Sequence, residues 1–273
     1  MKILLLLLAI ILFFPLYWMC KNSLETSMGI KKIPPNWIPK KITLENFRFI
    51  AMENPLIRWF ANTVAMHTIV ILMGLFCTVT ASYAFAVFKF RGSKILYWVF
   101  LTGIMVPYQA LLISRFILMR HLGLLNTWWA IICLGVFSPI GIVLIKNYFQ
   151  KIPQCMYDSA RIDGAGDIRI LFQIILPQCT PILGYMCIVS YVSAFQDFFW
   201  PMLVLNNSKL YTLPLGIVHY YITYMSTHPA LEYERLWGIQ MAGGVIMFLP
   251  VILIFVIFRK VFMKQFSLGG IKG

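Results

Sequence analysis

The sequence predicts an all-α membrane protein with six transmembrane helices in one transmembrane domain that covers residues 1–273. Hydrophobic residues make up 60% of the chain and charged residues only 12%, and the mean hydropathy is +0.81. Soluble domains carry about 25% charged residues. Six apolar runs are each near the roughly 20 residues that a helix needs to cross the hydrocarbon core. These predicted spans cover about residues 3–19, 62–88, 95–119, 127–145, 182–205 and 239–258.

The first apolar run follows Lys2 and could instead be a signal peptide. Aromatic residues crowd its end, where a cleavage site needs small residues, and Tyr17 and Trp18 are typical of an interfacial belt. We therefore expect a membrane helix here. The polar, proline-bearing stretch at residues 21–60 is predicted to be an external loop.

The net charge of +14 would suggest a nucleic-acid partner in a soluble protein, but the cations are spread over loops, so we expect no nucleic acid. Lys89, Arg91 and Lys94 stand together with no acid among them, which predicts a cytoplasmic loop by the positive-inside rule. Both chain ends would then be cytoplasmic. A simple count of cations on the two sides does not settle this orientation.

The sequence lacks the motifs of several catalytic classes. It contains no G-x-x-x-x-G-K-[ST] phosphate loop, so we expect no ATP hydrolysis by this chain. No Ser-His-Asp arrangement is apparent. The six cysteines form no Cys-x-x-Cys pair, and we expect no disulfide framework, no metal site and no bound cofactor. These observations favour a non-enzymatic membrane protein.

The segment 152–181 is the one long stretch in the second half that is not membrane-like. Pro153 suits the first turn of a helix that runs on to Ile162, and Gly164 is a natural stop at a position with φ > 0. Asp167 is expected to cap a second helix through its carboxylate, which Pro177 ends. Helical spacing places four apolar residues on one face of that second helix: Ile168, Leu171, Phe172 and Ile175.

Three short motifs follow one another in this segment: Asp158-Ser159-Ala160, Asp163-Gly164-Ala165, and Ile174 with Leu176-Pro177. In order and spacing they resemble the EAA loop of ABC-importer permeases, with Asp158 for the usual Glu and Ser159 for the first Ala. The resemblance implies a type I ABC importer permease fold and a helix that couples the chain to a cytosolic ATPase. The implied coupling residues are Pro153, Asp158, Ser159, Ala160, Asp163, Gly164, Ala165 and Pro177.

Further motifs occur along nearly the whole chain: Tyr83-Ala84-Phe85, Phe90-Arg91-Gly92, residues 122–127, residues 195–201, residues 212–216 and the glycine-rich ending at 269–273. Together they look like the smaller permease subunit of maltose-type carbohydrate importers. The resemblance implies a sugar or oligosaccharide as substrate. It also implies a second permease as heterodimer partner, two ATPase subunits that bind ATP and Mg, and an external solute-binding protein. The expected location is a bacterial or archaeal cytoplasmic membrane, as a multi-pass protein in contact with lipid.

Two alternatives stay open from the residues. An ABC importer for glycerol-phosphate or another polar solute would carry the same loop. An ion-coupled secondary transporter would need intramembrane charges or broken helices at a midplane site, and it would leave the segment 152–181 unexplained.

Asp197 is the only acid inside a predicted span, which makes it a candidate for the substrate pathway or for subunit contact, although it could also reach interfacial water. Gln109, Ser193 and Gln196 could hydrogen-bond sugar hydroxyls, or they could join helices to one another. At the chain end, Ser267, Gly269, Gly270 and Lys272 form a hypothetical second contact with the ATPases. The alternative is a frayed end that its lysines hold at the membrane.

Overall fold

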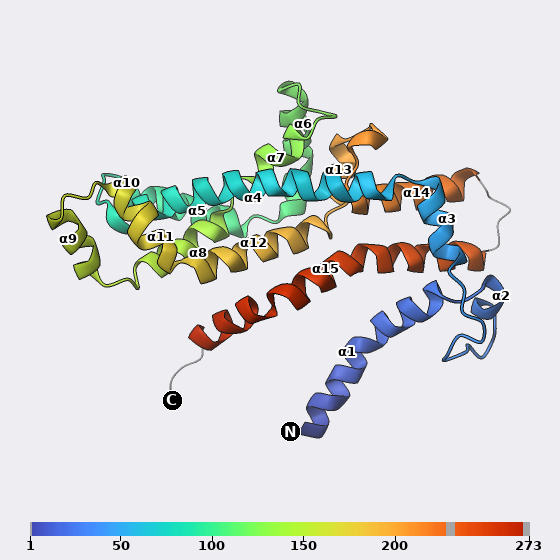
Figure 1. Ribbon diagram of the computed structural model, residues 1–273. Helices are drawn as coiled ribbons and strands as arrows, with labels where there is room; N and C mark the ends of the chain where they lie inside the picture. Colours follow the sequence, from blue (N-terminus) through green and yellow to red (C-terminus); the bar gives the residue numbers. More distant parts are fainter. Residues whose placement is uncertain (1, 228–232, 270–273) are drawn as a thin grey trace. The chain divides into compact units, whose positions relative to one another are not determined.

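The computed structural model describes residues 2–227 and 233–269, and in this part of the chain all regular structure is helical (Figure 1). The chain divides into two compact units. Unit 1 comprises Met1–Thr63, Phe195–Met202 and Asn207–Leu253, and unit 2 comprises Val64–Ala194, Leu203–Asn206 and Ile254–Gly273. Each unit is described by itself below.

Unit 1 contains the long first helix, two short helices of the following loop, and the helices of the last third of the chain. These are α1 (Lys2–Ser23), α2 (Ser27–Ile30), α3 (Glu45–Glu53), α13 (Phe199–Val204, shared with unit 2), η3 (Ser208–Leu210), α14 (Leu213–Thr227) and most of α15 (Tyr233–Gly269). The helix α4 (Leu56–Val87) begins here and continues into unit 2.

Polar contacts fix the start of α4 in unit 1. The Asn62 side-chain amide donates to the carbonyl groups of Lys209 and Tyr211, at 2.9 Å each, and the Thr63 hydroxyl accepts from the backbone N–H of Leu213 at 2.8 Å. Buried donors and acceptors are costly to leave unpaired, so these bonds hold the segment before α14 against α4. The sequence motif at residues 212–216 begins in this segment and continues into the first turn of α14.

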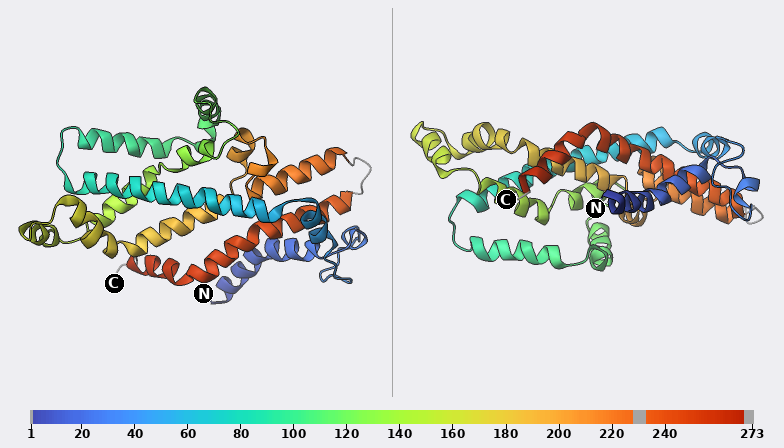
Figure 2. Two further views of the ribbon diagram at one scale, coloured as in Figure 1. Left: turned by 45° about the horizontal axis from the view of Figure 1, so that its top comes forward. Right: turned by 90° about the horizontal axis from the view of Figure 1, so that it is seen from below.

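Unit 2 contains the remaining helices. After α4 these are α5 (Ser93–Met105), η1 (Tyr108–Leu111), α6 (Leu112–His121), α7 (Trp129–Gly135), α8 (Pro139–Phe149), α9 (Gln154–Ile162), α10 (Asp167–Arg169), the π-helical η2 (Ile170–Ile175), α11 (Leu176–Gln178) and α12 (Thr180–Ala194). Figure 2 shows in two further views that α9 stands at one extremity of this unit.

Small residues let the helices of unit 2 approach closely. A side chain at Gly135 would bring its Cβ to 2.8 Å from a Val70 methyl group, and one at Gly74 would lie 3.1 Å from the Val136 carbonyl oxygen. Close backbone approach of this kind is typical of helix packing in membranes.

The predicted motif at residues 122–127 forms the turn that follows α6. Gly123 has φ +67° and ends the helix, with the N–H of Leu124 donating to the Met119 carbonyl at 2.9 Å. Asn126 has φ +58°, its N–H donates to the Val204 carbonyl, and its side-chain oxygen accepts from the N–H of Asn206. The turn is thus tied to the end of α13 by one backbone–backbone bond and one bond to the Asn126 side chain.

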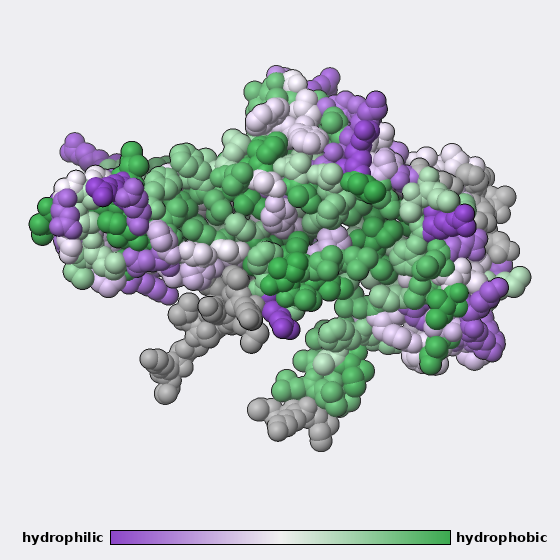
Figure 3. All heavy atoms as spheres, in the orientation of Figure 1, coloured by the Kyte–Doolittle hydropathy of each residue, from purple (hydrophilic) through white to green (hydrophobic). Residues whose placement is uncertain are grey.

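Four helical stretches of the described residues are long and apolar enough to cross a membrane: Leu4–Ser23, Leu56–Val87, Trp129–Phe149 and Leu236–Arg259. Two helix pairs pass the same test but are bent, Ser93–Met105 with Tyr108–His121 by 100° and Asp167–Gln178 with Thr180–Ala194 by 77°. By length and composition, four to six stretches are therefore candidate spans. Figure 3 shows hydrophobic residues over the middle of α4 and hydrophilic ones over the region of α9 and α10.

The structure corrects the shape of two predicted spans. The run 95–119 is broken at Val106, which is extended (φ −79°, ψ 120°) because Pro107 disfavours a helical conformation before it. The run 182–205 is also interrupted, since α12 already begins at Thr180 and ends at Ala194, and α13 is a separate short helix. The apolar runs had the right composition, but breaks in the helix divide them.

Candidate functional site

The helix α9 begins directly after Pro153, which is its N-cap with φ −57° and ψ 134° rather than a residue of the first turn. The N–H of Met156 donates to the Pro153 carbonyl at 3.0 Å and starts the helix. A surface cleft lies beside this start and is lined by Tyr148, Lys151, Ile152, Pro153 and Gln178. The helix thus starts where the sequence predicts, next to a hollow in its own unit.

One face of α9 is anchored in the core of unit 2. Tyr157 and Ala160 are buried together with residues of α4, α8 and η2, among them Phe149. The Tyr157 hydroxyl donates to the Phe149 carbonyl at 3.2 Å, and burial raises the pKa of this phenol, which stays protonated as a donor. Ala160 therefore faces inward and sets the position of α9 through packing.

The opposite face of α9 is exposed. Asp158 accepts a bond from the Gln154 side chain at 3.2 Å, and the Ser159 hydroxyl donates to the Cys155 carbonyl at 2.7 Å. Ile162 at the end of the helix is 86% exposed. A short helix with one buried and one exposed face, at the extremity of its unit, is a suitable shape for contact with another protein.

The helix ends in the elbow that the sequence predicts. Gly164 has φ +77°, its N–H donates to the Arg161 carbonyl at 3.0 Å, and the N–H of Ala165 donates to the Ala160 carbonyl at 2.9 Å. These two bonds form a Schellman motif, in which a left-handed residue closes the helix. The expected positive φ at Gly164 is confirmed.

The expected capping role of Asp167 is wrong. Gly166 is the N-cap of α10, and Asp167 is the first residue of that helix. Its carboxylate Oδ1 instead accepts from the Tyr83 hydroxyl at 3.2 Å and from Arg161 Nη2 at 3.3 Å. Because Arg161 and Asp167 are nearly half exposed, their ion pair contributes at most about 1 kcal/mol. Together the bonds join both sides of the elbow to α4.

The apolar face predicted for the second helix is also corrected. Ile168 is 78% exposed and Phe172 is exposed as well, whereas Ile170, Leu171 and Ile175 are buried. The reason is the π-helical turn η2, because i→i+5 bonds widen the turn and change which residues share a face.

Pro177 does not end the second helix at Leu176, as the sequence suggested. It lies inside the continuous helical run Asp167–Gln178, where α11 follows η2 directly, and this run ends at Gln178. The chain then bends by 77° before α12. Pro177 therefore begins the last turn before the bend.

The four candidate pathway residues belong to different units. Gln109 in η1 and Ser193 near the end of α12 are exposed in unit 2, while Gln196 and Asp197 lie between α12 and α13 in unit 1. The Asp197 carboxylate accepts a bond from the backbone N–H of Trp200 at 3.3 Å, as a capping residue of α13 does. This local role was not expected from the sequence.

Ser267 and Gly269 lie in the last turns of α15, while Gly270 and Lys272 lie outside the described residues. Within the described part of the chain, no group of three or more His, Cys, Asp or Glu residues could hold a metal ion.

Tyr83, Tyr157 and Arg161 fix the elbow and were not among the predicted coupling residues. Tyr83 does belong to one of the motifs at the end of α4, but its bond to Asp167 joins residues 84 positions apart and leaves no signal in the sequence.

Residues 70–267 match the family described as binding-protein-dependent transport system inner membrane component. The chain belongs to this family. It is thus a transporter permease component and a multi-pass protein of the cytoplasmic membrane. The match includes the whole of α9 and its elbow.

Two curated relatives are similar over most of their length. The arabinooligosaccharides transport system permease protein of Halalkalibacterium halodurans is 31% identical over 86% of this chain and 81% of its own. The galactooligosaccharides transport system permease protein of Bacillus subtilis is 30% identical over 97% of this chain and 92% of its own. They confirm the predicted resemblance to permeases of maltose-type carbohydrate ABC importers.

Among solved structures, a chain of a bacterial ABC transporter involved in the import of the acidic polysaccharide alginate has the same fold. The TM-score is 0.80, the sequence identity is 21%, and the match covers 95% of this chain and 94% of that one. The predicted fold of an ABC importer permease is confirmed at this level.

Proposed function

We propose that this chain is the non-catalytic permease subunit of a binding-protein-dependent ABC importer for a sugar or oligosaccharide, and that it forms half of the translocation pathway. The carbohydrate permeases that it resembles over 81% and 92% of their own lengths support this solute class. In the proposed assembly it pairs with a different permease chain, two cytosolic ATPases that bind ATP and Mg, and an external solute-binding protein. The host is a bacterium or an archaeon.

The proposed topology has six spans and both termini in the cytoplasm. Each of the two bent helix pairs then counts as one span. This arrangement places α9 and the loop with Lys89, Arg91 and Lys94 on the cytoplasmic side, as the positive-inside rule favours. The loop between α1 and α4 is then external.

The coupling element of the proposal is α9 with its elbow. Asp158, Ser159 and Ile162 present the exposed face to an ATPase, while Tyr157 and Ala160 fix the helix in unit 2. ATP-driven closure of the ATPases would move α9 as a rigid body and shift the spans between inward-facing and outward-facing states. Pro153 precedes α9, and Asp163, Gly164 and Ala165 form its elbow. Pro177 lies further along the chain, in α11 before the bend to α12.

The observation that carries the proposal is the Schellman elbow at Gly164 in a surface helix that is buried on one side and exposed on the other. Such an element transmits the movement of an ATPase to the spans, because its core contacts and the bonds of Asp167 keep it rigid.

In the pathway, we propose that Gln109, Ser193, Gln196 and Asp197 supply polar groups for a sugar. At the tail, we propose a second ATPase contact at Ser267, Gly269, Gly270 and Lys272.

Purification of the intact complex from its native membrane tests this function. We expect an ATPase, a second permease and a carbohydrate-loaded binding protein to be isolated with the chain. A complex without any ATPase would contradict the proposal, and a complex with an ATPase but a non-carbohydrate solute would contradict the solute class alone.

Truncation after Gln265 tests the tail, since unchanged ATPase binding, hydrolysis and uptake would remove its proposed role.

A further inference from the structure

The loop between α1 and α3 has a rigid base in unit 1. Lys21 and Glu25 form an ion pair of 3.0 Å whose side chains are each 1% exposed. The Asn46 side-chain amide donates to the carbonyl groups of Ser23 at 2.9 Å and Glu25 at 3.2 Å. Because a buried ion pair is stable only with good geometry and satisfied neighbours, these contacts hold the base of the loop in one conformation.

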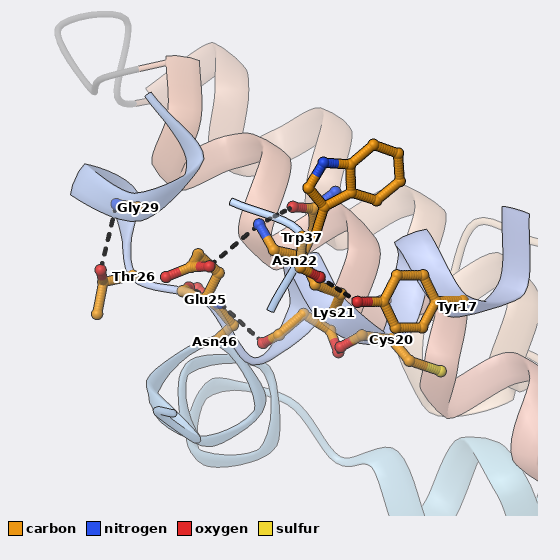
Figure 4. Close-up of polar contacts among 10 residues, drawn as sticks. Tyr17, Cys20, Lys21, Asn22, Glu25, Thr26, Gly29, Trp37 and Asn46 are labelled. Atoms are coloured by element: carbon orange, nitrogen blue, oxygen red, sulfur yellow. Dashed lines mark hydrogen bonds and ion pairs between the residues drawn. The ribbon is translucent and has the colours of Figure 1, made fainter. Parts of the chain in front are cut away.

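The far part of this loop, residues 31–42, turns back onto α1, and we call it the basic loop. The Trp37 ring lies with its centroid 6.2 Å from that of Phe14 and 6.1 Å from that of Trp18. The Tyr17 hydroxyl donates to the Trp37 carbonyl oxygen (Figure 4). The basic loop is therefore fixed beside α1 and does not extend freely into solvent.

These contacts set the depth of the basic loop in the membrane. The apolar run of α1 ends at Met19, and the polar residues from Lys21 on leave the hydrocarbon core. Phe14, Tyr17 and Trp18 thus stand in the last apolar turns, where aromatic residues typically mark the headgroup region. Trp37 lies at that same level, and α1 is exposed there, with Phe14 44% exposed.

The side chains of the basic loop combine apolar and cationic groups. Ile33, Trp37 and Ile38 are 94%, 65% and 75% exposed. Four exposed lysines flank them, Lys31, Lys32, Lys40 and Lys41, and no acid occurs between Glu25 and Glu45. The side-chain contact with Lys40 and its charge lower the pKa of Lys32, so two cations are held close together. An anionic group would relieve this repulsion.

We propose that the basic loop is a membrane-interface surface that inserts Ile33, Trp37 and Ile38 among phospholipid headgroups and binds anionic headgroups through its lysines. The leaflet is the one that α1 reaches at its C-terminal end, which is the external leaflet in the topology proposed above. Exposed apolar side chains at headgroup level favour lipid over an acidic protein, since they would otherwise face water. The surface anchors unit 1 at the membrane through a second element beside α1.

Photo-crosslinking tests this proposal. The full chain, with whatever subunits are isolated with it, carries p-benzoyl-phenylalanine in place of Ile38 and is placed in nanodiscs of equimolar phosphatidylcholine and phosphatidylglycerol. We expect a lipid adduct by mass spectrometry. The same probe at Ile162, an equally apolar and exposed residue of α9, is the matched control and should give no lipid adduct. A crosslink from position 38 to the binding protein, or no crosslink, overturns the proposal.

The lysines are tested in the same experiment. We expect phosphatidylglycerol adducts to outnumber phosphatidylcholine adducts about five-fold, the preference that one lysine near an anionic surface typically confers. With Lys31→Gln, Lys32→Gln, Lys40→Gln and Lys41→Gln combined, the two lipids should crosslink equally, and the continued phosphatidylcholine adduct shows that the loop is still folded. An unchanged preference in this variant overturns anionic binding by the lysines. The result does not depend on the proposed transport function, because adducts form without ATP or solute.

Discussion

Replacement of Gly164 by alanine should impair coupling through the backbone alone. A Cβ at this position would meet no atom within 4 Å, so the substitution creates no clash. The residue has φ +77°, however, which L-residues with a side chain adopt only at a cost. Gly166, two positions later, is the matched control, because it also has open space around it but has φ −72° and ψ 162°.

The magnitude follows from the left-handed conformation. For a non-glycine residue it costs roughly 1–2 kcal/mol, which changes an equilibrium about 5- to 30-fold. Domains are stable by about 5–15 kcal/mol, so the chain should still fold and insert while the elbow is populated less. We expect Gly164→Asn to retain more activity than Gly164→Ala, because asparagine tolerates this conformation best after glycine. Gly166→Ala should be close to the unchanged protein.

The assay is binding-protein-stimulated ATP hydrolysis and solute uptake by the assembled importer in liposomes, with its thermal unfolding measured in parallel. The expected order of activity is Gly166→Ala, then Gly164→Asn, then Gly164→Ala. Equal activity of the two alanine variants would refute the reasoning, since it would show that the conformation of the elbow has no role in coupling.

Further predictions concern stability and are measured by thermal or denaturant unfolding of the purified complex. Lys21→Met leaves the buried Glu25 carboxylate unpaired and should lower the free energy of unfolding by about 3–5 kcal/mol. Adding Glu25→Met should restore most of this stability, and a double variant as unstable as the single one would show that the ion pair itself is needed. Gly216→Ala would place its Cβ 2.2 Å from the Trp59 ring and should lower the free energy of unfolding by about 1–3 kcal/mol. An unchanged midpoint of the unfolding transition would contradict this. Tyr83→Phe removes one hydrogen bond at the elbow and should lower the free energy of unfolding by about 1 kcal/mol. A loss of several kcal/mol would mean that the hydroxyl has further partners.

The sequence predicted the elements that local chemistry determines. The Asp-Gly dipeptide at 163–164 carries the signal of a helix end because glycine alone enters the left-handed region freely, and the structure has that conformation. The start of α9 at Pro153 was predicted to within one position for a similar reason. The apolar runs indicated membrane helices because hydropathy depends only on composition.

The remaining features depend on breaks in the helix or on distant partners. Pro107 stands within the predicted span 95–119. A count of apolar residues takes no account of how proline constrains the backbone, so the 100° bend was not predicted. The π-helical turn at 170–175 has no simple sequence pattern and changed the buried face of the second helix. The bonds of Asp167 to Tyr83 and Arg161 arise from tertiary packing, so spacing within the segment could not predict them.

Solute uptake into liposomes tests the central claim most directly, because the sequence lacks a phosphate loop and the proposed coupling element serves a partner ATPase. Liposomes that contain this chain with its second permease and ATPases should accumulate a carbohydrate when ATP is supplied to the ATPases and the loaded binding protein is present on the other side. Omission of either ATP or the ATPases should abolish accumulation. Concentrative uptake by this chain alone, without ATP, would contradict the account.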